Sequence, residues 1–287
     1  MTVNPGIVVV DKPAGVTSHH VVGRLRRLLG TRKVGHAGTL DPMATGVLIL
    51  GVNRATRLLG HLALHDKRYL ATVRLGEAST TDDAEGELTS IADPSDLGFA
   101  RLEAAAAPLR GQIQQVPSAV SAIKVNGKRA YALARAGVDV ELKARTVEVT
   151  RLDLLAIRHN ERTLDVDIDV ECSSGTYVRA IARDLGRALG VGGHLTALRR
   201  TRIGNYTLAQ AVELGEQPPT LMTMAEAARL SFPCLIVDEA QARDIGFGRR
   251  LALGLDAEPT GMIGPGGELL ALYRPDGDGA RPTAVFG

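Results

Sequence analysis

The sequence predicts an α+β protein that ends in a small β-rich segment. The clearest strand is residues 163–172, where apolar residues alternate with acidic ones. A tight turn leads from this strand into residues 178–189, whose apolar residues recur at helical spacing. The last part of the chain, from about residue 233, contains strand-like runs among glycine turns, which is typical of a small β-rich domain.

The first 75 residues predict three further strands and one helix. The strands are residues 6–10, 46–51 and 68–75, which are short and rich in apolar residues. The helix is residues 18–30, with Ser18 as its N-cap and Gly30 as its end. Its apolar face carries Val22, Leu25, Leu28 and Leu29, and its exposed side carries Arg24, Arg26 and Arg27.

The strand at 163–172 and the helix after it define a junction with two notable side chains. The apolar residues of the strand face the core, and its acidic residues form a water-facing surface. The core residues of the following helix are Val178, Ile181, Ala182, Leu185 and Leu189. Tyr177 and Arg179 lie where strand gives way to helix, so rigid elements position them while they stay open to a cleft.

Two other segments interrupt the regular pattern. Residues 117–145 contain a basic, helix-like part next to a segment interrupted by glycine. We interpret them as an insertion, the excursion. Residues 215–220, "GEQPPT", mark a break, and Pro233 precedes the strand-like "CLIV". A short helix then begins at Asp238, and residues 268–273 predict another strand.

The net charge of +2 conceals an uneven distribution. Residues 1–210 hold 28 Lys and Arg against 21 Asp and Glu, whereas residues 211–287 hold 6 against 11. Between Lys12 and Leu40 there is no acidic residue, but there are six basic ones. A patch of one sign is typical of a surface that binds a polyanion, although a solvated helix face has the same composition.

Several classes of function are disfavoured by what the sequence lacks. It has no Walker A loop, no GxSxG or HExxH motif, and its seven histidines do not have the spacing of metal ligands. Cys172 and Cys234 are far apart, so neither a disulfide framework nor a cysteine-based zinc site is expected. No signal peptide or membrane span is recognisable, and we expect a cytoplasmic protein.

The stretch "GHAGTLDPMATG", residues 35–46, places one carboxylate in a constrained loop. Pro42 disfavours helical geometry at Asp41, and the three glycines permit sharp turns or close approach to a ligand. Asp41 is therefore either a carboxylate aimed into a cleft or an ordinary turn residue, since Asp and Pro are both common in turns. Arg179 favours the first interpretation if it pairs with Asp41 and keeps it ionised. Tyr69 opens a strand and offers an aromatic face for a base, although a tyrosine at the edge of the core is the simpler reading.

Seven stretches occur in order between residues 6 and 205: "DKPAGVTS", "GHAGTLDPMATGVL", "KRY", "LGEASTTDDAEG", "QVPSAVSAIKVNGKRAYALARAG", "CSSGTYVRAIARDLG" and "GGHLTALRRTRIG". Taken together, these motifs closely resemble the TruB family of tRNA pseudouridine synthases. The resemblance implies a mixed, largely antiparallel central sheet with flanking helices, the pseudouridine synthase fold. It also implies a catalytic domain at 1–232, with a thumb insertion at about 117–145, and a PUA-like domain at 233–287.

The resemblance also implies roles for individual residues. Asp41 corresponds to the catalytic aspartate, Arg179 to its arginine partner and Tyr69 to the tyrosine that stacks on the target base. The residues implied to bind the uridine, besides Tyr69, are His36, Tyr177, Leu198 and Lys12. For the phosphates of the T-arm, we expect contacts from Arg24, Arg27, Lys33, Lys124, Lys128 and Arg129.

The implied function is an isomerase that converts uridine to pseudouridine at position 55, in the T loop of tRNA. The reaction needs no cofactor and no metal, because it breaks the bond from C1′ to N1 and rejoins the base through C5 without net redox change. Asp41 acts either as a nucleophile or as the base that initiates elimination at the sugar, and both remain open. Flipping the base out of the loop accompanies either route. We expect a monomer that needs neither guide RNA nor protein partner.

Two alternatives and several departures from the family pattern remain. The first alternative is a non-catalytic protein that binds or folds tRNA on the same scaffold, and the second is a guide-dependent rRNA modifier of the same superfamily. The departures are Ser118 and Val120 after Pro117, where the family often has proline and tyrosine, Ser79 for a common threonine and Ile49 for a common proline. The acidic balance of residues 211–287 argues against a strong electrostatic grip on RNA by the tail.

Overall fold

The computed structural model describes residues 3–118, 124–125, 128–129 and 142–286. The chain divides into two compact units. The first comprises Met1–Pro42, Gly46–Ala63 and Ile203–Gly287, and the second comprises Met43–Thr45 and Leu64–Arg202. The beginning and the end of the chain therefore belong to the same unit.

Three strands open the first unit. They are β1 (Gly6–Lys12), β2 (Val34–Ala37) and β3 (Thr45–Val52), and β3 pairs antiparallel with both of the others. Residues along β1 and β3 are buried almost without interruption, which fits their continuous apolar runs. The predicted strands at 6–10 and 46–51 are confirmed, and β2 is an addition.

Helix α1 (Ser18–Leu29) confirms the predicted helix and its end but corrects its cap. Thr17, not Ser18, is the N-cap, because its hydroxyl accepts the amide of His20 at 3.0 Å. Ser18 is already helical and its side chain is buried. Gly30 closes the helix in the left-handed conformation, at φ 61°, which glycine adopts without strain.

The rest of the first unit consists of short elements and a small sheet. The short elements are η1 (Asn53–Arg57), α2 (Leu59–Leu62), β13 (Tyr206–Thr207), η3 (Leu208–Gln210) and α6 (Met224–Ser231). The sheet has the order β14 (Cys234–Ile236), β15 (Thr260–Ile263), β16 (Leu269–Asp276) and β17 (Gly279–Val285), with α7 (Glu239–Gly246) after β14. Only the pair β14 and β15 is parallel.

The small C-terminal sheet has an apolar core on each side. One core contains Ile263, Leu272 and Phe286 together with residues of β1, β3 and α6. The other contains Met262 and Tyr273 and lies toward α7, which begins at the N-cap Asp238 as predicted. The β-rich tail is confirmed, and it shares a core with the beginning of the chain; its PUA-like identity stays a prediction.

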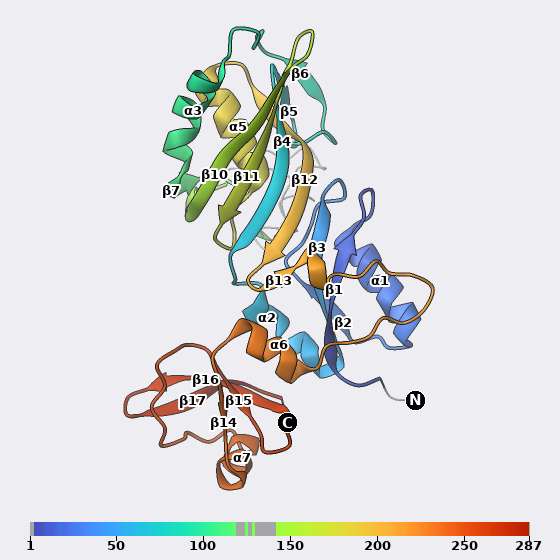
Figure 1. Cartoon of the computed structure of the whole chain (residues 1–287), viewed down its shortest axis with the longest axis vertical. Coiled ribbons are helices and arrows are strands. Elements are labelled where there is room, and N and C mark those ends of the chain that lie inside the picture. The colour runs from blue at the N-terminus through green and yellow to red at the C-terminus, as the bar shows by residue number, and fades with distance from the viewer. Residues whose placement is uncertain (1–2, 119–123, 126–127, 130–141, 287) are drawn as a thin grey trace. The chain divides into compact units, whose positions relative to one another are not determined.

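The second unit is built on a sheet with the order β12 (Gly193–Ile203), β4 (Lys67–Leu75), β11 (Leu164–Cys172), β10 (Arg145–His159) and β7 (Gly111–Gln115). β4, β11, β10 and β7 pair antiparallel in turn. Helices α3 (Phe99–Ala106) and α5 (Val178–Leu189) lie together on one face of this sheet, as Figure 1 shows. A short 3-10 turn, η2 (Ala107–Leu109), follows α3. These sheets and helices confirm the α+β class and the largely antiparallel pairing.

The opposite face of this sheet carries paired charges rather than the acidic surface predicted from residues 163–172. Asp165 binds Arg74 at 2.8 Å and Asp169 binds Arg68 at 2.6 Å, both across the ladder to β4. Asp167 pairs with Arg158 of β10. Each of these three carboxylates has a lowered pKa, first because of its hydrogen bond to arginine. The pattern of the single strand could not reveal the arginines that neighbouring strands supply.

Two hairpins complete the second unit. β5 (Glu77–Ser79) pairs with β6 (Leu88–Ser90), and their connection contains the motif residues 80–87. Within the predicted excursion, β8 (Lys124–Val125) pairs with β9 (Lys128–Arg129), a ladder that the sequence did not predict. Val120 and most of the helix-like part lie outside the described residues.

Candidate active site

Asp41 lies in the loop between β2 and β3, and both of its neighbours are held through their backbone. The hydroxyl of Ser18 donates to the carbonyl of Leu40 at 3.0 Å and accepts its amide at 2.9 Å. On the other side, the carbonyl of Pro42 accepts a hydrogen bond from the ammonium of Lys12 at 3.2 Å. Asp41 itself is half-buried. The backbone that carries this carboxylate is therefore fixed on both sides.

Lys12 links the segment that follows β1 to this loop. Its fully buried ammonium also donates to the carbonyls of Pro13, at 2.8 Å, and Val16, at 2.7 Å. The amide of Gly15 donates to the carbonyl of Pro42 at 2.9 Å. A buried cation needs such hydrogen bonds to offset its desolvation. These contacts give Lys12 a part in holding the loop, and the predicted contact with substrate stays a prediction.

His36 is near the end of β2 and is half-buried. Its ring meets the ring of His19, in the first turn of α1, edge to face, with the centroids 5.5 Å apart and the planes at 83°. Aromatic rings favour this arrangement. The contact restricts the orientation of His36, and the structure thus places a ring of defined orientation a few residues before Asp41.

Tyr69 and Leu198 are both buried in the second unit. Tyr69 is on β4, on the face that also carries Lys67, while Leu198 is on β12, the neighbouring strand. Burial, followed by the nearby charge of Arg200, lowers the pKa of Lys67 to about 8. Lys67 donates to the carbonyl of His65 at 2.7 Å. The "KRY" motif therefore places a buried cation and a buried aromatic ring on one face of the strand.

Arg179 is in the first turn of α5, and only 5% of its side chain is exposed. Its Nη1 donates to the carbonyl of Thr81 at 2.8 Å and lies 3.1 Å from Oδ2 of Asp83. Asp83 is equally buried, and its Oδ1 accepts hydrogen bonds from the Thr81 hydroxyl and, at 3.1 Å, from the amide of Glu85. A buried guanidinium and carboxylate thus satisfy one another. The expected pairing of Arg179 with Asp41 involves both units and stays a prediction.

Tyr177 is the N-cap residue of α5, and the side chain of Gln115 holds its backbone. Gln115 is fully buried; its Oε1 accepts the amide of Tyr177 at 2.8 Å, and its Nε2 donates to the carbonyl at 3.1 Å. The guanidinium of Arg145 lies over the Tyr177 ring, 4.8 Å from its centroid. The predicted junction is therefore rigid, and the end of β7 supplies part of its support.

The residues predicted to contact the RNA backbone have different local settings. Arg27 and Lys33 are exposed, whereas Arg24 is partly buried and donates to the carbonyl of Gly215 at 3.1 Å. Lys124 lies on β8, and Lys128 and Arg129 lie on β9. Their roles stay predictions.

Sequence reasoning missed Asp83, Gln115 and the loop contact of Ser18. Asp83 stands in the motif "LGEASTTDDAEG", yet the motif alone does not indicate which aspartate meets which arginine. The sequence predicts Ser18 as the helix cap because serine and threonine are both favoured there. Its true partner, Leu40, lies 22 residues away in the chain.

The described part of the chain offers no metal cluster and no membrane-spanning helix. No group of three or more His, Cys, Asp or Glu in it is arranged to hold a metal ion. None of its helices is both long enough and apolar enough to cross a bilayer.

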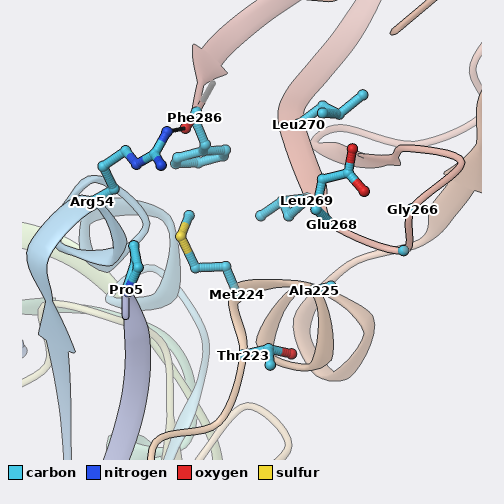
Figure 2. Close-up of a pocket in the computed structure, with 11 residues that line it drawn as sticks. Pro5, Arg54, Thr223, Met224, Ala225, Gly266, Glu268, Leu269, Leu270 and Phe286 are labelled. Atoms are coloured by element: carbon cyan, nitrogen blue, oxygen red, sulfur yellow. Dashed lines mark hydrogen bonds between the residues drawn. The ribbon is translucent and has the colours of Figure 1, made fainter. Parts of the chain in front are cut away.

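A cavity of about 420 Å³ lies in the first unit, where Figure 2 shows Met224 and Phe286 beside Arg54, which donates to the Phe286 carbonyl at 2.9 Å. The residues that line it include none of the predicted site residues.

Comparison with protein families identifies the chain along almost its whole length. The model of the N-terminal domain of TruB family pseudouridylate synthases matches residues 26–178, and the model of the tRNA pseudouridylate synthase B C-terminal domain matches residues 179–226. A third model, the C-terminal domain of tRNA pseudouridine synthase II, matches residues 232–287.

Similar proteins agree with this assignment. The tRNA pseudouridine synthase B of Cutibacterium acnes is 62% identical over 96% of this chain and 95% of its own length. The proteins of the same name from an Arthrobacter species and from Mycobacterium tuberculosis are 55% and 51% identical, each over 98% of this chain and 96% of their own lengths.

Solved structures show the same fold. A Cbf5–Nop10–Gar1 complex contains a chain that matches with a TM-score of 0.73 and 24% identity, over 98% of this chain and 85% of that one. An H/ACA ribonucleoprotein bound to a substrate RNA gives a TM-score of 0.71 at 23% identity, with the same coverage. The fold expected from the resemblance is thereby confirmed. From the family models and the relatives together, the chain belongs to the TruB family of pseudouridine synthases, which are isomerases that act on uridine in RNA.

Proposed function

We propose that this protein converts uridine 55, in the T loop of tRNA, to pseudouridine, with Asp41 as the catalytic carboxylate. Relatives at 51–62% identity over nearly the whole chain are tRNA pseudouridine synthases B, which supports tRNA as the substrate. The observation that carries the assignment of Asp41 is its loop. Leu40 and Pro42 are both held through their backbone, so the backbone from which the half-buried carboxylate of Asp41 extends is fixed.

The reaction consists of one exchange of bonds and one proton transfer. The bond from C1′ to N1 of uracil breaks, the base turns, C5 bonds to C1′, and the proton on C5 leaves while N1 gains one. Asp41 attacks the substrate covalently, or it removes a proton from the sugar to begin an elimination. In both routes it acts as an ionised carboxylate. Since the product is an isomer of the substrate, neither a redox partner nor an energy source is needed.

Arg179 supports this role through charge and burial. An opposite charge beside a half-buried carboxylate favours the ionised form. Asp83 and the carbonyl of Thr81 hold the guanidinium in a defined position at 3.1 and 2.8 Å. We infer that Arg179 also pairs with Asp41, which would keep that carboxylate ionised.

The target base must leave its stack to reach the site, at a cost of a few kcal/mol. Tyr69 would offset part of this cost by stacking on the flipped uracil, and His36 would fill the space that the base leaves. The contact between His36 and His19 limits the entropy that His36 loses in doing so. Tyr177, Leu198 and Lys12 complete the proposed uridine pocket.

Phosphate contacts would position the T-arm. We assign them to Arg24, Arg27 and Lys33 in the first unit and to Lys124, Lys128 and Arg129 in the excursion. Arg27 and Lys33 are exposed, as such contacts require. Replacing both with glutamine should weaken tRNA binding and reduce the slope of log K against log salt by about 2, measured by filter binding between 50 and 200 mM salt. An unchanged slope would remove these two residues from the interface.

The non-catalytic alternative differs in one measurable outcome. Asp41→Asn keeps the shape of the side chain but removes its charge, and it should abolish pseudouridine formation while tRNA binding stays within about twofold. Undiminished product from this variant would remove Asp41 from the chemistry. A wild-type protein that binds tRNA but never yields pseudouridine would favour the binding protein.

The position of the product and the need for partners are tested together. The pure protein, without guide RNA or other proteins, is incubated with unmodified tRNA, and pseudouridine is mapped at nucleotide resolution. We expect a single product at position 55. Product only outside the T loop would overturn the substrate assignment, and product only after addition of a guide RNA would favour the guide-dependent alternative.

A further inference from the structure

Helix α5 presents two arginines to two consecutive aspartates. Arg179 and Arg183 are one helical turn apart and therefore lie on the same face of α5. Nη1 of Arg179 lies 3.1 Å from Asp83, and Nη1 of Arg183 lies 3.1 Å from Asp82. The first pair is almost fully buried, and the second is 21% and 12% exposed. The turn between β5 and β6 is thus attached to α5 at two adjacent points.

The backbone of Asp82 is in an unusual conformation. Its φ is +61°, in the left-handed region, where Asp and Asn are the non-glycine residues best tolerated. Its amide donates to the carbonyl of Ser79 at 3.2 Å, and its carbonyl accepts the amide of Leu195 at 3.0 Å. The residue directly before Asp83 is therefore in a tight turn, so a rotation at Asp82 redirects the carboxylate that holds Arg179.

Arg183 also reaches a second segment. Its Nη2 donates to the carbonyl of Val116 at 2.7 Å, and its Nε donates to Asp184 at 2.9 Å. Val116 directly follows Gln115, which holds the backbone of Tyr177. A single guanidinium therefore joins the turn at Asp82 to the end of β7. The planar fork of an arginine carries five N–H donors in a fixed geometry, which suits these separate contacts.

We propose that Arg183 is a positioning residue for the active site. It fixes Asp82, and thereby the direction of Asp83 and Arg179, and it fixes the end of β7 beside Tyr177. This inference rests on the proposed catalytic role of Arg179. Arg183 acts on turnover through these neighbours, since misplacing a reacting group by about 1 Å costs up to about a hundredfold in rate.

The test is a double-mutant cycle in the full-length protein, with pseudouridine formation on unmodified tRNA as the readout. The variants are Arg183→Gln, Asp82→Asn and the double variant; asparagine is chosen because it tolerates the positive φ of Asp82. We expect kcat to fall about tenfold in each single variant, with KM within about twofold, and the double variant to be no slower than Arg183→Gln. Additive losses, or a change confined to KM, would contradict the proposal.

Two further variants, Arg187→Gln and Arg179→Gln, complete the test. Arg187→Gln removes a charge one turn further along α5, from an exposed side chain, and should leave kcat unchanged; an equal loss there would show a general effect of helix charge and overturn the proposal. If Arg183→Gln does not fold, as judged by thermal melting, the kcat of Asp82→Asn alone tests the proposal. Arg179→Gln separates the two levels of inference, because a fully active Arg179→Gln refutes the proposed role of Arg179, whereas an inactive one beside a fully active Arg183→Gln refutes only the positioning role of Arg183.

Discussion

The loop around Asp41 and the turn around Asp83 hold their carboxylates by different means. At Asp41, Ser18 and Lys12 bind the backbone of the residues on either side. At Asp83, the carboxylate itself is bound, by the guanidinium of Arg179 and by its own turn. The first arrangement fixes the backbone that carries the side chain of Asp41. The second uses the oxygens of Asp83 to fix Arg179, so Asp83 acts as a supporting carboxylate.

The largest effect should follow from breaking the second arrangement. Asp83→Asn removes the charge opposite the buried guanidinium of Arg179, and losing one partner of a buried ion pair costs about 3 kcal/mol or more. We expect the free energy of unfolding to fall by about that amount in urea titrations, with turnover reduced at least tenfold. Asp96→Asn breaks the exposed pair with Arg101 and serves as a control, with a loss below about 1 kcal/mol. Equal losses in the two variants would show that burial of the Asp83 pair is irrelevant.

A smaller effect separates the two hydroxyls at the start of α1. Thr17→Ala removes the helix cap and should cost about 1 kcal/mol of stability without changing kcat. Ser18→Ala removes two hydrogen bonds to Leu40, with a similar loss of about 1–2 kcal/mol. Because Leu40 precedes Asp41, only Ser18→Ala should also lower kcat. If both variants lower kcat equally, the helix rather than the loop contact controls Asp41.

The contrast between these two hydroxyls shows what the sequence could and could not predict. The pattern of glycines and Pro42 singled out the Asp41 loop, because backbone restrictions are local. The contacts that hold the loop come from Lys12 and Ser18, and no local pattern distinguishes a serine that caps its own helix from one that binds a distant backbone. The helix itself followed from its periodicity, and its end followed from Gly30, which is favoured as a helix stop.

The sequence did not predict the strands β10 and β12, for a similar reason. β10 alternates apolar and polar residues, but its pairing with β11 is interrupted by irregularities between Val149 and Arg151 and between Leu154 and Ala156. Such irregularities shift which side chains face the core, so the period of two is lost. In β12, the arginines near Leu198 obscure the strand, and one of them, Arg200, is buried. Tertiary pairing, not local preference, forms these two strands.

The smallest effect concerns the buried charge of Lys67, in the same unit as Asp83. Its pKa is lowered from 10.5 to about 8, mainly by burial, so the unfolded chain binds more protons than the folded protein between these values. Stability should therefore rise with pH above about 8, by at most about 1.4 kcal/mol per pH unit. Cys172 has the opposite effect at higher pH, because burial raises its pKa from 9.0 to about 11 and stability is lost between these values. The clean window is thus pH 8 to 9.

Urea titrations of the wild type and of Lys67→Met across this window test the assignment. The wild type should gain stability relative to Lys67→Met as pH rises, because only the wild type loses a buried charge. Lys33→Met, at an exposed lysine, should follow the wild type. A wild-type curve parallel to that of Lys67→Met would mean that Lys67 stays charged in the fold. The second unit would then hold a buried cation as firmly as the first holds Lys12, whose ammonium is surrounded by three carbonyls.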